Sequence, residues 1–268
     1  MPVFSQQDRL RVVLVSTRNP LNIGAAARAM SNFGFRHLRV VNPYEAAFRE
    51  ARSAVGASEL LRSAEEYASV GEAVADCALV VGTTAGRDRG LQHPLRRLDD
   101  SARLIGKRLA SGPVALLFGS EKRGLSNQDL SHCHWLLHVP TRAEHISMNL
   151  GQAVAVCLYE LACELEGGSK PEKVTAERSL KKSKNAQRAR NAKLAQQEKT
   201  GPATAGELER ITEVLLEALG ASGYLNSTPS ASTQEKLRRQ VRRLNLSAGD
   251  AEIWLGMLRQ IVWKMHSQ

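Results

Sequence analysis

The stretch N-I-G-A-A-A-R, residues 22–28, decides the expected fold, because it follows an apolar run at 12–15 and a turn-like segment at 16–20. Asn22 suits a helix N-cap, since its side chain can accept an unpaired backbone N–H. Gly24 and the three alanines leave little bulk on the first turns, so another backbone or a ligand can approach closely. Arg28 then projects from a smooth surface, where a guanidinium suits a phosphate or carboxylate. The competing interpretation is a small-residue helix packed on a sheet, with Arg28 at its solvent edge.

Two later stretches favour the ligand-binding interpretation. Residues 117–125, L-F-G-S-E-K-R-G-L, are typical of a buried strand running into a Gly-flanked loop. Val139-Pro140, followed by S-M-N-L at 147–150, is typical of a strand end, a loop and a helix start. In order and spacing, the three stretches resemble the motifs of the SpoU-type 2′-O-ribose RNA methyltransferases of the SPOUT superfamily. These motifs are N-x-G-x-x-x-R, G-x-E-x-x-G-L, and a proline followed by S-x-N. Met148 replaces the leucine common in the family, which is a near-isosteric exchange.

This resemblance implies an α/β fold: a parallel-sheet SPOUT domain whose C-terminal loops form a trefoil knot around S-adenosylmethionine. By the same match, the expected cofactor-binding residues are Thr83, Thr84, Ala85, Gly119, Glu121, Arg123, Val139, Ser147, Met148 and Asn149. It also implies a homodimer packed through the first and last helices of this domain, with the arginine of one subunit near the cofactor of the other.

The catalytic residues implied by the resemblance are Asn22, Arg28, Glu121, Ser147 and Asn149. Arg28 is the family's proposed base or orienting group. An arginine pKa of about 12.5–13.8 makes it a poor base, so we expect it to clamp an RNA phosphate and polarise the ribose hydroxyl. Asn22 would orient Arg28 and the ribose, Glu121 would shape its loop, and Ser147 and Asn149 would bind the ribose or the methionine end. The plainer alternatives are a loop ion pair for Glu121 and an N-cap for Ser147.

Apolar runs at regular intervals predict the rest of this domain. They predict parallel strands at 11–15, 37–41, 78–82, 114–118 and 136–139, with helices at 22–33, at 99–110 and from Ser147 onward. Gly34 should end the first helix, and two or three short helices should fill 44–76. Small and hydroxyl residues after the strand at 78–82 favour a ligand crevice at the carboxyl ends of the strands. Neither G-x-G-x-x-G nor a Walker motif is present, which disfavours the common nucleotide-binding folds.

The net charge is distributed unevenly along the 268 residues. The net charge of +10 and the pI of 9.8 favour a polyanionic partner, whereas 4% aromatic residues argue against base stacking as the main contact. Residues 1–168, the SPOUT domain, carry +2, and residues 201–268 carry +1. Most of the surplus, +7, lies at 169–200, within a basic linker predicted for 169–204. That linker is either a solvated spacer or an arm that follows RNA phosphates.

Residues 205–268 are predicted to form a small all-α domain that binds RNA. Its second helix should start at a capping box, Ser232-x-x-Glu235, and carry one basic face, formed by Arg238, Arg239, Arg242 and Arg243. Such a face either binds phosphates or is simply solvated. A third helix should start at Ser247-x-x-Asp250, with inward-facing Ile253, Trp254, Met257, Leu258 and Ile261. Together with the N-terminal motifs, the R-R-x-x-R-R-L pattern and the tryptophan resemble the sequences of one branch of the family, the TrmJ-like branch. Its members are bacterial tRNA methyltransferases that modify a pyrimidine ribose in the anticodon loop.

The remaining features narrow the class of protein. Four cysteines without a C-x-x-C pair, no secretory leader and no long apolar run predict reduced thiols in a cytoplasmic protein. His132-Cys133-His134 has no second ligand pair at a suitable spacing, so no metal is expected. The leading hypothesis is a tRNA 2′-O-methyltransferase. The alternatives are a ribosomal RNA 2′-O-methyltransferase and a non-catalytic RNA-binding protein that keeps the knotted fold.

Overall fold

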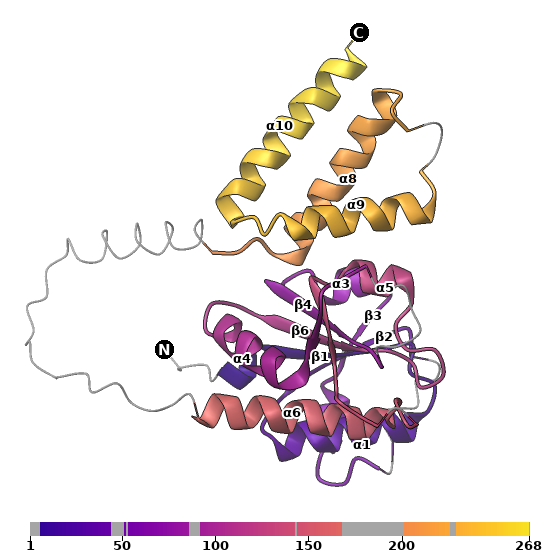
Figure 1. Cartoon of the computed structure of the whole chain (residues 1–268), viewed down its shortest axis with the longest axis vertical. Helices are drawn as coiled ribbons and strands as arrows, with labels where there is room; N and C mark the ends of the chain where they lie inside the picture. The colour runs from indigo at the N-terminus through magenta and orange to yellow at the C-terminus, as the bar shows by residue number, and fades with distance from the viewer. Residues whose placement is uncertain are drawn as a thin grey trace, which may run out of the picture.

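The computed structural model describes residues 6–43, 51, 53–85, 92–142, 144–167, 201–225 and 229–267, and residues 169–200 of the basic linker predicted for 169–204 lie outside them. Within these residues the chain forms one seven-stranded, wholly parallel sheet of order β3-β2-β1-β6-β4-β7-β5 (Figure 1). The strands are β1 (Leu10–Val15), β2 (His37–Val41), β3 (Glu65–Tyr67), β4 (Leu79–Thr83), β5 (Leu95–Arg97), β6 (Val114–Phe118) and β7 (Trp135–His138).

The five predicted strands are confirmed, but β3 and β5 were missed. Each is three residues long and lies at an edge of the sheet, and their sequences, Glu-Glu-Tyr and Leu-Arg-Arg, are largely exposed. An edge strand packs few side chains, so it needs no apolar run, and only apolar runs signalled strands in the sequence. The prediction of helices alone over 44–76 is therefore wrong at β3, and residues 44–50 lie outside the described residues.

Helices cover both faces of the sheet. The described helices are η1 (Gln6–Arg9), α1 (Pro20–Asn32), α2 (Ser58–Arg62), α3 (Val70–Ala73), α4 (Leu98–Leu109), α5 (Asn127–Ser131), α6 (Leu150–Gly167), α8 (Ala205–Ala221), α9 (Ala231–Arg243) and α10 (Ala248–His266). The larger core joins one sheet face to α1, α2, α4 and α6, and the smaller core joins the other face to α3, α5 and the first residue of α8. Figure 1 shows α6 and α1 on one side and α3 and α5 on the other.

The structure corrects three predicted helix starts. Asn19, not Asn22, caps α1, because Pro20 is well suited to the first helical position and begins the helix earlier. Asn149, not Ser147, caps α6: its Oδ1 accepts from Gly151 N at 2.9 Å. Ser230 caps α9 by accepting from Thr233 N, so the capping box at Ser232 is wrong.

Two other predicted helix ends are confirmed. Gly34 follows α1 with φ +76°, and the N–H of the buried Phe35 then bonds back to Met30 O at 2.9 Å. Ser247 caps α10 by accepting from Asp250 N at 3.1 Å. Both helix ends could be predicted from the sequence because each depends only on residues within one helical turn.

The small residues of α1 serve packing within the chain. A Cβ added to Gly24 would collide with Ser53, and a Cβ added to Gly151 of α6 would lie 2.7 Å from the Ala25 Cβ. The close approach expected from the sequence is therefore made by Ala51, Ser53 and Ala54 and by α6. This packing fixes the N-terminal turns of α1 and α6 beside each other.

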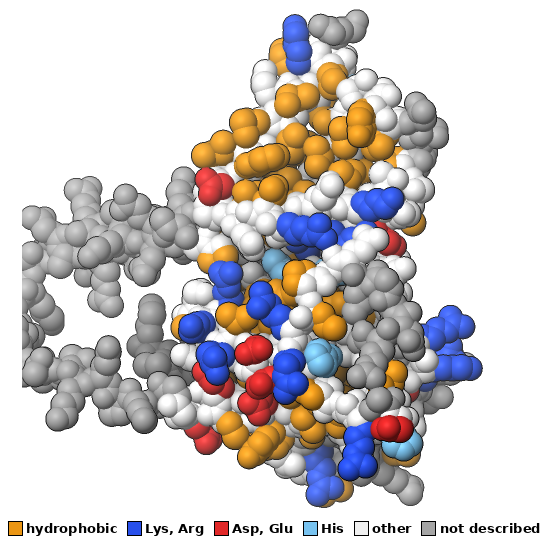
Figure 2. Space-filling model, in the orientation of Figure 1, with side chains coloured by type: hydrophobic (Ala, Val, Ile, Leu, Met, Phe, Trp, Pro, Cys, Tyr) orange, Lys and Arg blue, Asp and Glu red, His pale blue; other side chains and the backbone are white. Residues whose placement is uncertain are grey.

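Helices α8, α9 and α10 pack together around a small core and rest on the face covered by α3 and α5 (Figure 1). Ala205 N and Gly206 N donate to Cys77 O and Ala75 O at 2.8 and 3.0 Å. Of the α10 residues predicted to face inward, Leu258 is buried, whereas Ile253 and Met257 are 61% and 51% exposed; Trp254 and Ile261 are also exposed. With α10 packed mainly on α8, that apolar side stays open, and Figure 2 shows hydrophobic side chains gathered over these helices. No described helix is both long enough and apolar enough to cross a membrane.

Candidate active site

A cavity of about 340 Å³ lies at the carboxyl ends of the adjacent strands β6, β4 and β7. Residues 83–85 line it after β4, residues 118–125 after β6, and Leu137 and Val139 at β7. Residues 146–148 and the first turns of α6 complete it. Nine of the ten predicted cofactor-binding residues line this cavity: Thr83, Thr84, Ala85, Gly119, Glu121, Arg123, Val139, Ser147 and Met148.

Most of the remaining lining is apolar and lies outside the predicted set of cofactor-binding residues. It comprises Phe118, Leu125, Leu130, Leu137, Ile146, Leu150, Ala153 and Cys157. A pocket lined by apolar side chains uses the same residue types as a core, so the sequence alone does not distinguish the two. The cavity therefore combines an apolar interior with polar loops, which suits a small organic cofactor.

The loop after β6 turns back tightly, and glycine is required there. A Cβ added to Gly119 would collide with the backbone of Gly124 and Leu125, and Gly124 has φ +67°. Gly124 N donates to Ser120 O at 2.8 Å and closes the turn. Glu121, Lys122 and Arg123 therefore lie at an exposed tip between strand and cavity.

Residues from all three sequence motifs meet at the rim of this cavity. Asn22 Nδ2 donates to Glu121 Oε1 at 2.8 Å, and Asn149 Nδ2 donates to Asn22 Oδ1 at 3.0 Å. Glu121 also accepts from the backbone N–H groups of Arg18 and Asn19, each at 3.2 Å. One network thus joins the start of α1, the loop after β6 and the start of α6.

The Glu121 carboxylate is held ionised by this network. Partial burial would raise its pKa, but hydrogen bonds from Asn22 and from backbone N–H groups, including those of Arg18 and Asn19, more than offset burial and lower the pKa. A carboxylate that accepts several such bonds is a fixed anchor and a poor proton carrier. This agrees with the expected loop-shaping role and not with a loop ion pair.

Asn149 and Ser147, which were both expected to contact the ligand, take different places in the structure. Both polar atoms of Asn149 are engaged, Oδ1 by the N-terminus of α6 and Nδ2 by Asn22, and Asn149 does not line the cavity. Ser147 is exposed and does line it. Ser147 can therefore contact a ligand directly, whereas Asn149 positions Asn22.

Arg28 stands apart from the network. It is exposed on α1, six residues beyond Asn22, and lines neither this cavity nor the groove described below. Within the part of the chain that the structure describes, no hydrogen bond or ion pair holds its guanidinium. It is available to a partner outside this chain.

The predicted basic face of α9 is mostly turned inward. Arg238 is bidentate to Glu209 of α8, with distances of 2.7–2.9 Å, and donates to Ser131 Oγ at 3.0 Å. Arg242 is 2% exposed and donates to His132 O at 2.8 Å. Arg239 and Arg243 both donate to Gln92, to its side-chain and backbone oxygens respectively. These arginines hold the C-terminal helices on the sheet domain.

The His132-Cys133-His134 triplet is structural. The His134 ring accepts from Val80 N at 3.1 Å, and Cys133 packs where a Gly82 Cβ would stand. Burial, reinforced by the positive charge of Arg242, lowers the pKa of both histidines to about 3. No cluster of three metal-ligating side chains occurs among the described residues.

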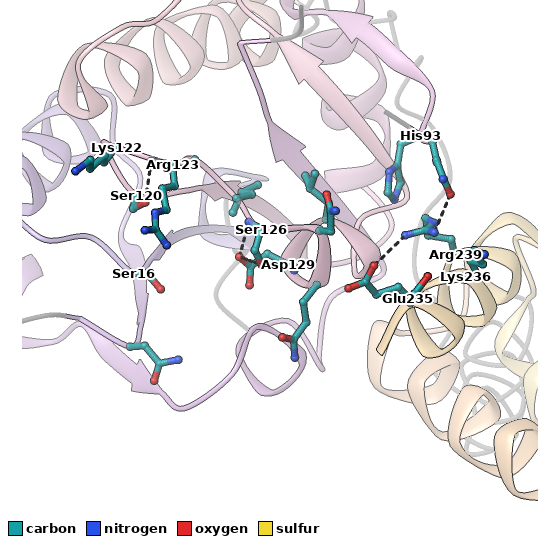
Figure 3. A pocket seen from close by; sticks show the side chains of 18 of the residues that line it. Ser16, His93, Ser120, Lys122, Arg123, Ser126, Asp129, Glu235, Lys236 and Arg239 are labelled. Atoms are coloured by element: carbon teal, nitrogen blue, oxygen red, sulfur yellow. Dashed lines mark hydrogen bonds and ion pairs between the residues drawn. The ribbon is translucent and has the colours of Figure 1, made fainter. Parts of the chain in front are cut away.

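A second, larger hollow of about 1140 Å³ adjoins the cavity across the loop at 120–125 (Figure 3). It runs from that loop and the ends of β1 and β2 to α9, and we call it the polar groove. Its lining includes Ser16, Arg18, Asn42, Gln92, His93, Lys122, Arg123, Asp129, Glu235, Lys236 and Arg239. Of these residues, Arg123 was predicted to bind the cofactor and Arg239 to bind RNA. Ser16, Asn42, Glu235 and Lys236 gave no ligand-binding signal in the sequence, because the two walls come together only through docking of the C-terminal helices.

The all-parallel sheet, with a part-apolar cavity at adjacent strand ends and polar anchors on its rim, defines an α/β enzyme that binds a small cofactor. The SpoU rRNA Methylase family model matches residues 9–159, which contain all three motifs and the whole cavity. The chain belongs to this family.

Relatives match across both parts of the chain. The tRNA (cytidine/uridine-2′-O-)-methyltransferase TrmJ of Sodalis glossinidius is 32% identical over 253 residues, covering 94% of this chain and 91% of that protein. The tRNA (cytidine/uridine/adenosine-2′-O-)-methyltransferase TrmJ of Pseudomonas aeruginosa is 35% identical over 256 residues, covering 94% and 93%. The crystal structure of TrmJ from Z. mobilis superposes with a TM-score of 0.73 at 29% identity, covering 94% of this chain and 98% of that one.

Proposed function

We propose that this protein transfers a methyl group from S-adenosylmethionine to a ribose 2′-hydroxyl of tRNA, at a pyrimidine of the anticodon loop. The observation that carries the proposal is the network linking Glu121, Asn22 and Asn149, which joins the three motifs at the cavity rim. The names and near-complete coverage of the relatives support tRNA over ribosomal RNA.

The cavity fits the proposed cofactor in size and character. Its volume of about 340 Å³ falls in the range of small-ligand sites, and its apolar interior suits an adenine ring. Backbone groups at the ends of β4, β6 and β7 are available for hydrogen bonds to the ribose and the methionine. When bound, S-adenosylmethionine supplies the methyl group as an electrophile on sulfur.

Arg28 serves the RNA side of the reaction. Its exposed guanidinium, which has no partner among the described residues, can clamp an RNA phosphate and polarise the 2′-hydroxyl, while the high pKa of an arginine makes it unsuited to accept the proton. Asn22 is locked between Glu121 and Asn149, so the first turns of α1 are fixed and Arg28 is presented from a rigid base.

The working unit is a homodimer in which Arg28 of one subunit serves the cavity of its partner. Two observations support this: Arg28 does not line the cavity of its own chain, and Leu21 of α1 and Val156 and Tyr159 of α6 are exposed. The trefoil knot belongs to the same proposal, as does the division into 1–168, a basic linker at 169–204 and an RNA-binding domain at 205–268.

The test is to incubate the purified protein with S-adenosylmethionine and total tRNA from a strain lacking the gene, and to identify ribose-methylated nucleosides by mass spectrometry. A new 2′-O-methylpyrimidine in tRNA is expected. Methylation of ribosomal RNA alone would favour the rRNA alternative. No binding of S-adenosylhomocysteine to the folded protein in calorimetry would instead favour a non-catalytic RNA-binding protein.

A further inference from the structure

The polar groove has two walls from distant parts of the chain. Figure 3 shows Ser16, Ser120, Lys122 and Arg123 on one side and His93, Glu235, Lys236 and Arg239 on the other. The groove shares residues 120, 122–125 and 130 with the cofactor cavity. A chain lying in the groove would therefore pass directly beside the methyl-donor site.

The charges that remain available in the groove are positive. Asp129 is occupied by the Ser126 N–H and hydroxyl at 2.8 and 2.7 Å, and Glu235 faces Arg239 at 3.8 Å. Lys122 and Lys236 are exposed, one on each wall, and neither has a hydrogen bond or ion pair among the described residues. Two free ammonium groups on opposite walls suit a polyanion lying between them.

The floor of the groove offers neutral polar groups. Ser16 and Asn42 follow the neighbouring strands β1 and β2 and have φ of 51° and 44°, a conformation uncommon for residues other than glycine. Both side chains are exposed in the groove. Asn42 carries both a donor and an acceptor, as base or ribose recognition requires, so the groove can do more than attract charge.

The α9 wall is held in place by the arginines that the sequence suggested for RNA. Arg238 and Arg242 tie α9 to Glu209, Ser131 and the His132 carbonyl. These bonds set the position of Lys236, two residues before Arg238. The groove therefore exists only because the C-terminal helices dock on the sheet domain. The arginines that hold this docking are different residues from the lysines that face the groove.

We propose that the polar groove binds the single-stranded RNA segment next to the methylated nucleotide, with Lys122 and Lys236 on its phosphates and Asn42 on a base or ribose. This rests on the proposed function and deepens it. Unpaired RNA is the favoured partner because its bases are open to side chains, whereas the deep major groove of an RNA duplex is not.

The test uses full-length protein, S-adenosylhomocysteine and a tRNA transcript that the wild-type protein methylates. The variant Lys122→Ala/Lys236→Ala removes both groove lysines; Lys107→Ala/Lys264→Ala removes two exposed lysines of α4 and α10 that lie outside the groove. The groove variant should bind RNA roughly tenfold more weakly, with a salt slope lower by about 1.4, since each single-strand phosphate contact contributes about 0.7. The control should stay near wild type in both, and cofactor affinity should be unchanged in all proteins.

Asn42→Gly tests recognition without charge, because glycine keeps the left-handed backbone. Its matched control is Asn245→Gly, which has the same conformation at φ 47° but lies outside the groove. Loss of one hydrogen bond should lower kcat/KM for tRNA by roughly two- to tenfold with the salt slope unchanged, while the control is unaffected.

The outcomes separate the two proposals. If the wild-type protein methylates tRNA and the groove lysine pair matches its control in affinity and slope, the groove inference is wrong and the proposed function stands. If the wild-type protein methylates no RNA, the proposed function fails and the groove inference fails with it.

Discussion

Arg28 of α1 and Arg242 of α9 were both assigned to RNA from the sequence, yet the structure places them in opposite environments. Arg28 is exposed and has no partner among the described residues, whereas Arg242 is 2% exposed and bonded to the His132 carbonyl. The difference lies in what surrounds each arginine. Arg28 belongs to a motif whose place after a strand end fixes its position in the fold. The α9 arginines showed only that they share one face of a helix, and that pattern does not reveal which part of the chain packs against the face.

The largest expected effect sharpens this comparison at Arg28. Arg28→Ala should lower kcat for tRNA methylation by about 10²–10³-fold, because it removes a preorganised donor that polarises the reacting hydroxyl. Calorimetry should give wild-type S-adenosylhomocysteine affinity, since Arg28 does not line the cavity. Arg36→Ala, at another exposed arginine just beyond α1, is the control and should be fully active. A joint loss of cofactor affinity and rate would place Arg28 at the cofactor and contradict this division.

At the α9 side, the sharpest test is Glu209→Gln. Removing the carboxylate leaves Arg242 buried without its counter-charge, and breaking such a pair costs about 3 kcal/mol. The C-terminal helices should detach, measured as faster amide hydrogen exchange at Ala205 and Gly206, which bond across to the sheet domain. Glu213→Gln, at an exposed site on the same helix, is the control. If exchange at these two amides stays at the wild-type rate, the arginine cluster does not hold the docking.

Glu121→Gln should have a smaller effect, confined to the cavity rim. Glutamine keeps the shape but turns an N–H₂ toward some of the donors from Arg18, Asn19 and Asn22, at a cost of about 1–3 kcal/mol. We expect a lower methylation rate with docking of α9 intact, read as unchanged protection at Ala205 and Gly206. The matched control is Glu144→Gln, at an exposed position off the rim. Full activity of Glu121→Gln would show that the network is not needed to present Arg28.

The sequence predicted the central part of the fold because its signals were local. Five buried strands gave apolar runs, and nine of the ten residues that the family resemblance assigned to cofactor binding line the cavity at one edge of the parallel sheet. The misses share the opposite property. Asn149 faces Asn22 because α6 packs beside α1, and the open side of α10 depends on how little of it α8 covers.

The C-terminal arginines show the same limit in terms of charge. A guanidinium on a helix face binds a carboxylate and a phosphate equally well, so spacing alone could not distinguish Glu209 from RNA. Its partner lies 29 residues away for Arg238, and His132 lies 110 residues away from Arg242. No pattern within one helix carries that information. The groove lysines escaped notice for the same reason.

As the pH falls, the packing of the C-terminal helices on the sheet domain should be destabilised before the hydrogen-bond network at the cavity rim. Burial, together with arginine charges, lowers the pKa of His132 to about 3 and that of His93 to about 4. The unfolded chain takes up these protons below pH about 6.5 and the folded chain does not, so the stability that these neutral histidines contribute is complete above that pH and falls with pH toward their folded values. Each histidine adds about 1.4 kcal/mol per pH unit to the slope.

Urea unfolding at pH values between about 6.5 and 4.5 measures the slope of the unfolding free energy against pH. His132→Gln should reduce this slope by the contribution of one proton. The rim is expected to respond later, because the pKa of Glu121 is lowered from 4.5 and its stabilisation is lost only as the pH falls below that value. An unchanged slope in His132→Gln would mean that His132 takes up its proton alike in the folded and the unfolded chain.

The smallest expected effect concerns Met148, the one departure from the family motif. Met148 is half-buried in the cavity lining, where it supplies apolar surface beside the loop after β7. Methionine and leucine have nearly the same volume, so Met148→Leu should change stability by less than about 1.5 kcal/mol and S-adenosylhomocysteine affinity by only a few fold. Met148→Asp, which places a charge against the apolar interior, should abolish cofactor binding and serves as the contrast. If leucine alone cost tenfold or more in affinity, the thioether would be making a specific contact with the cofactor, and Met148 would be more than apolar lining.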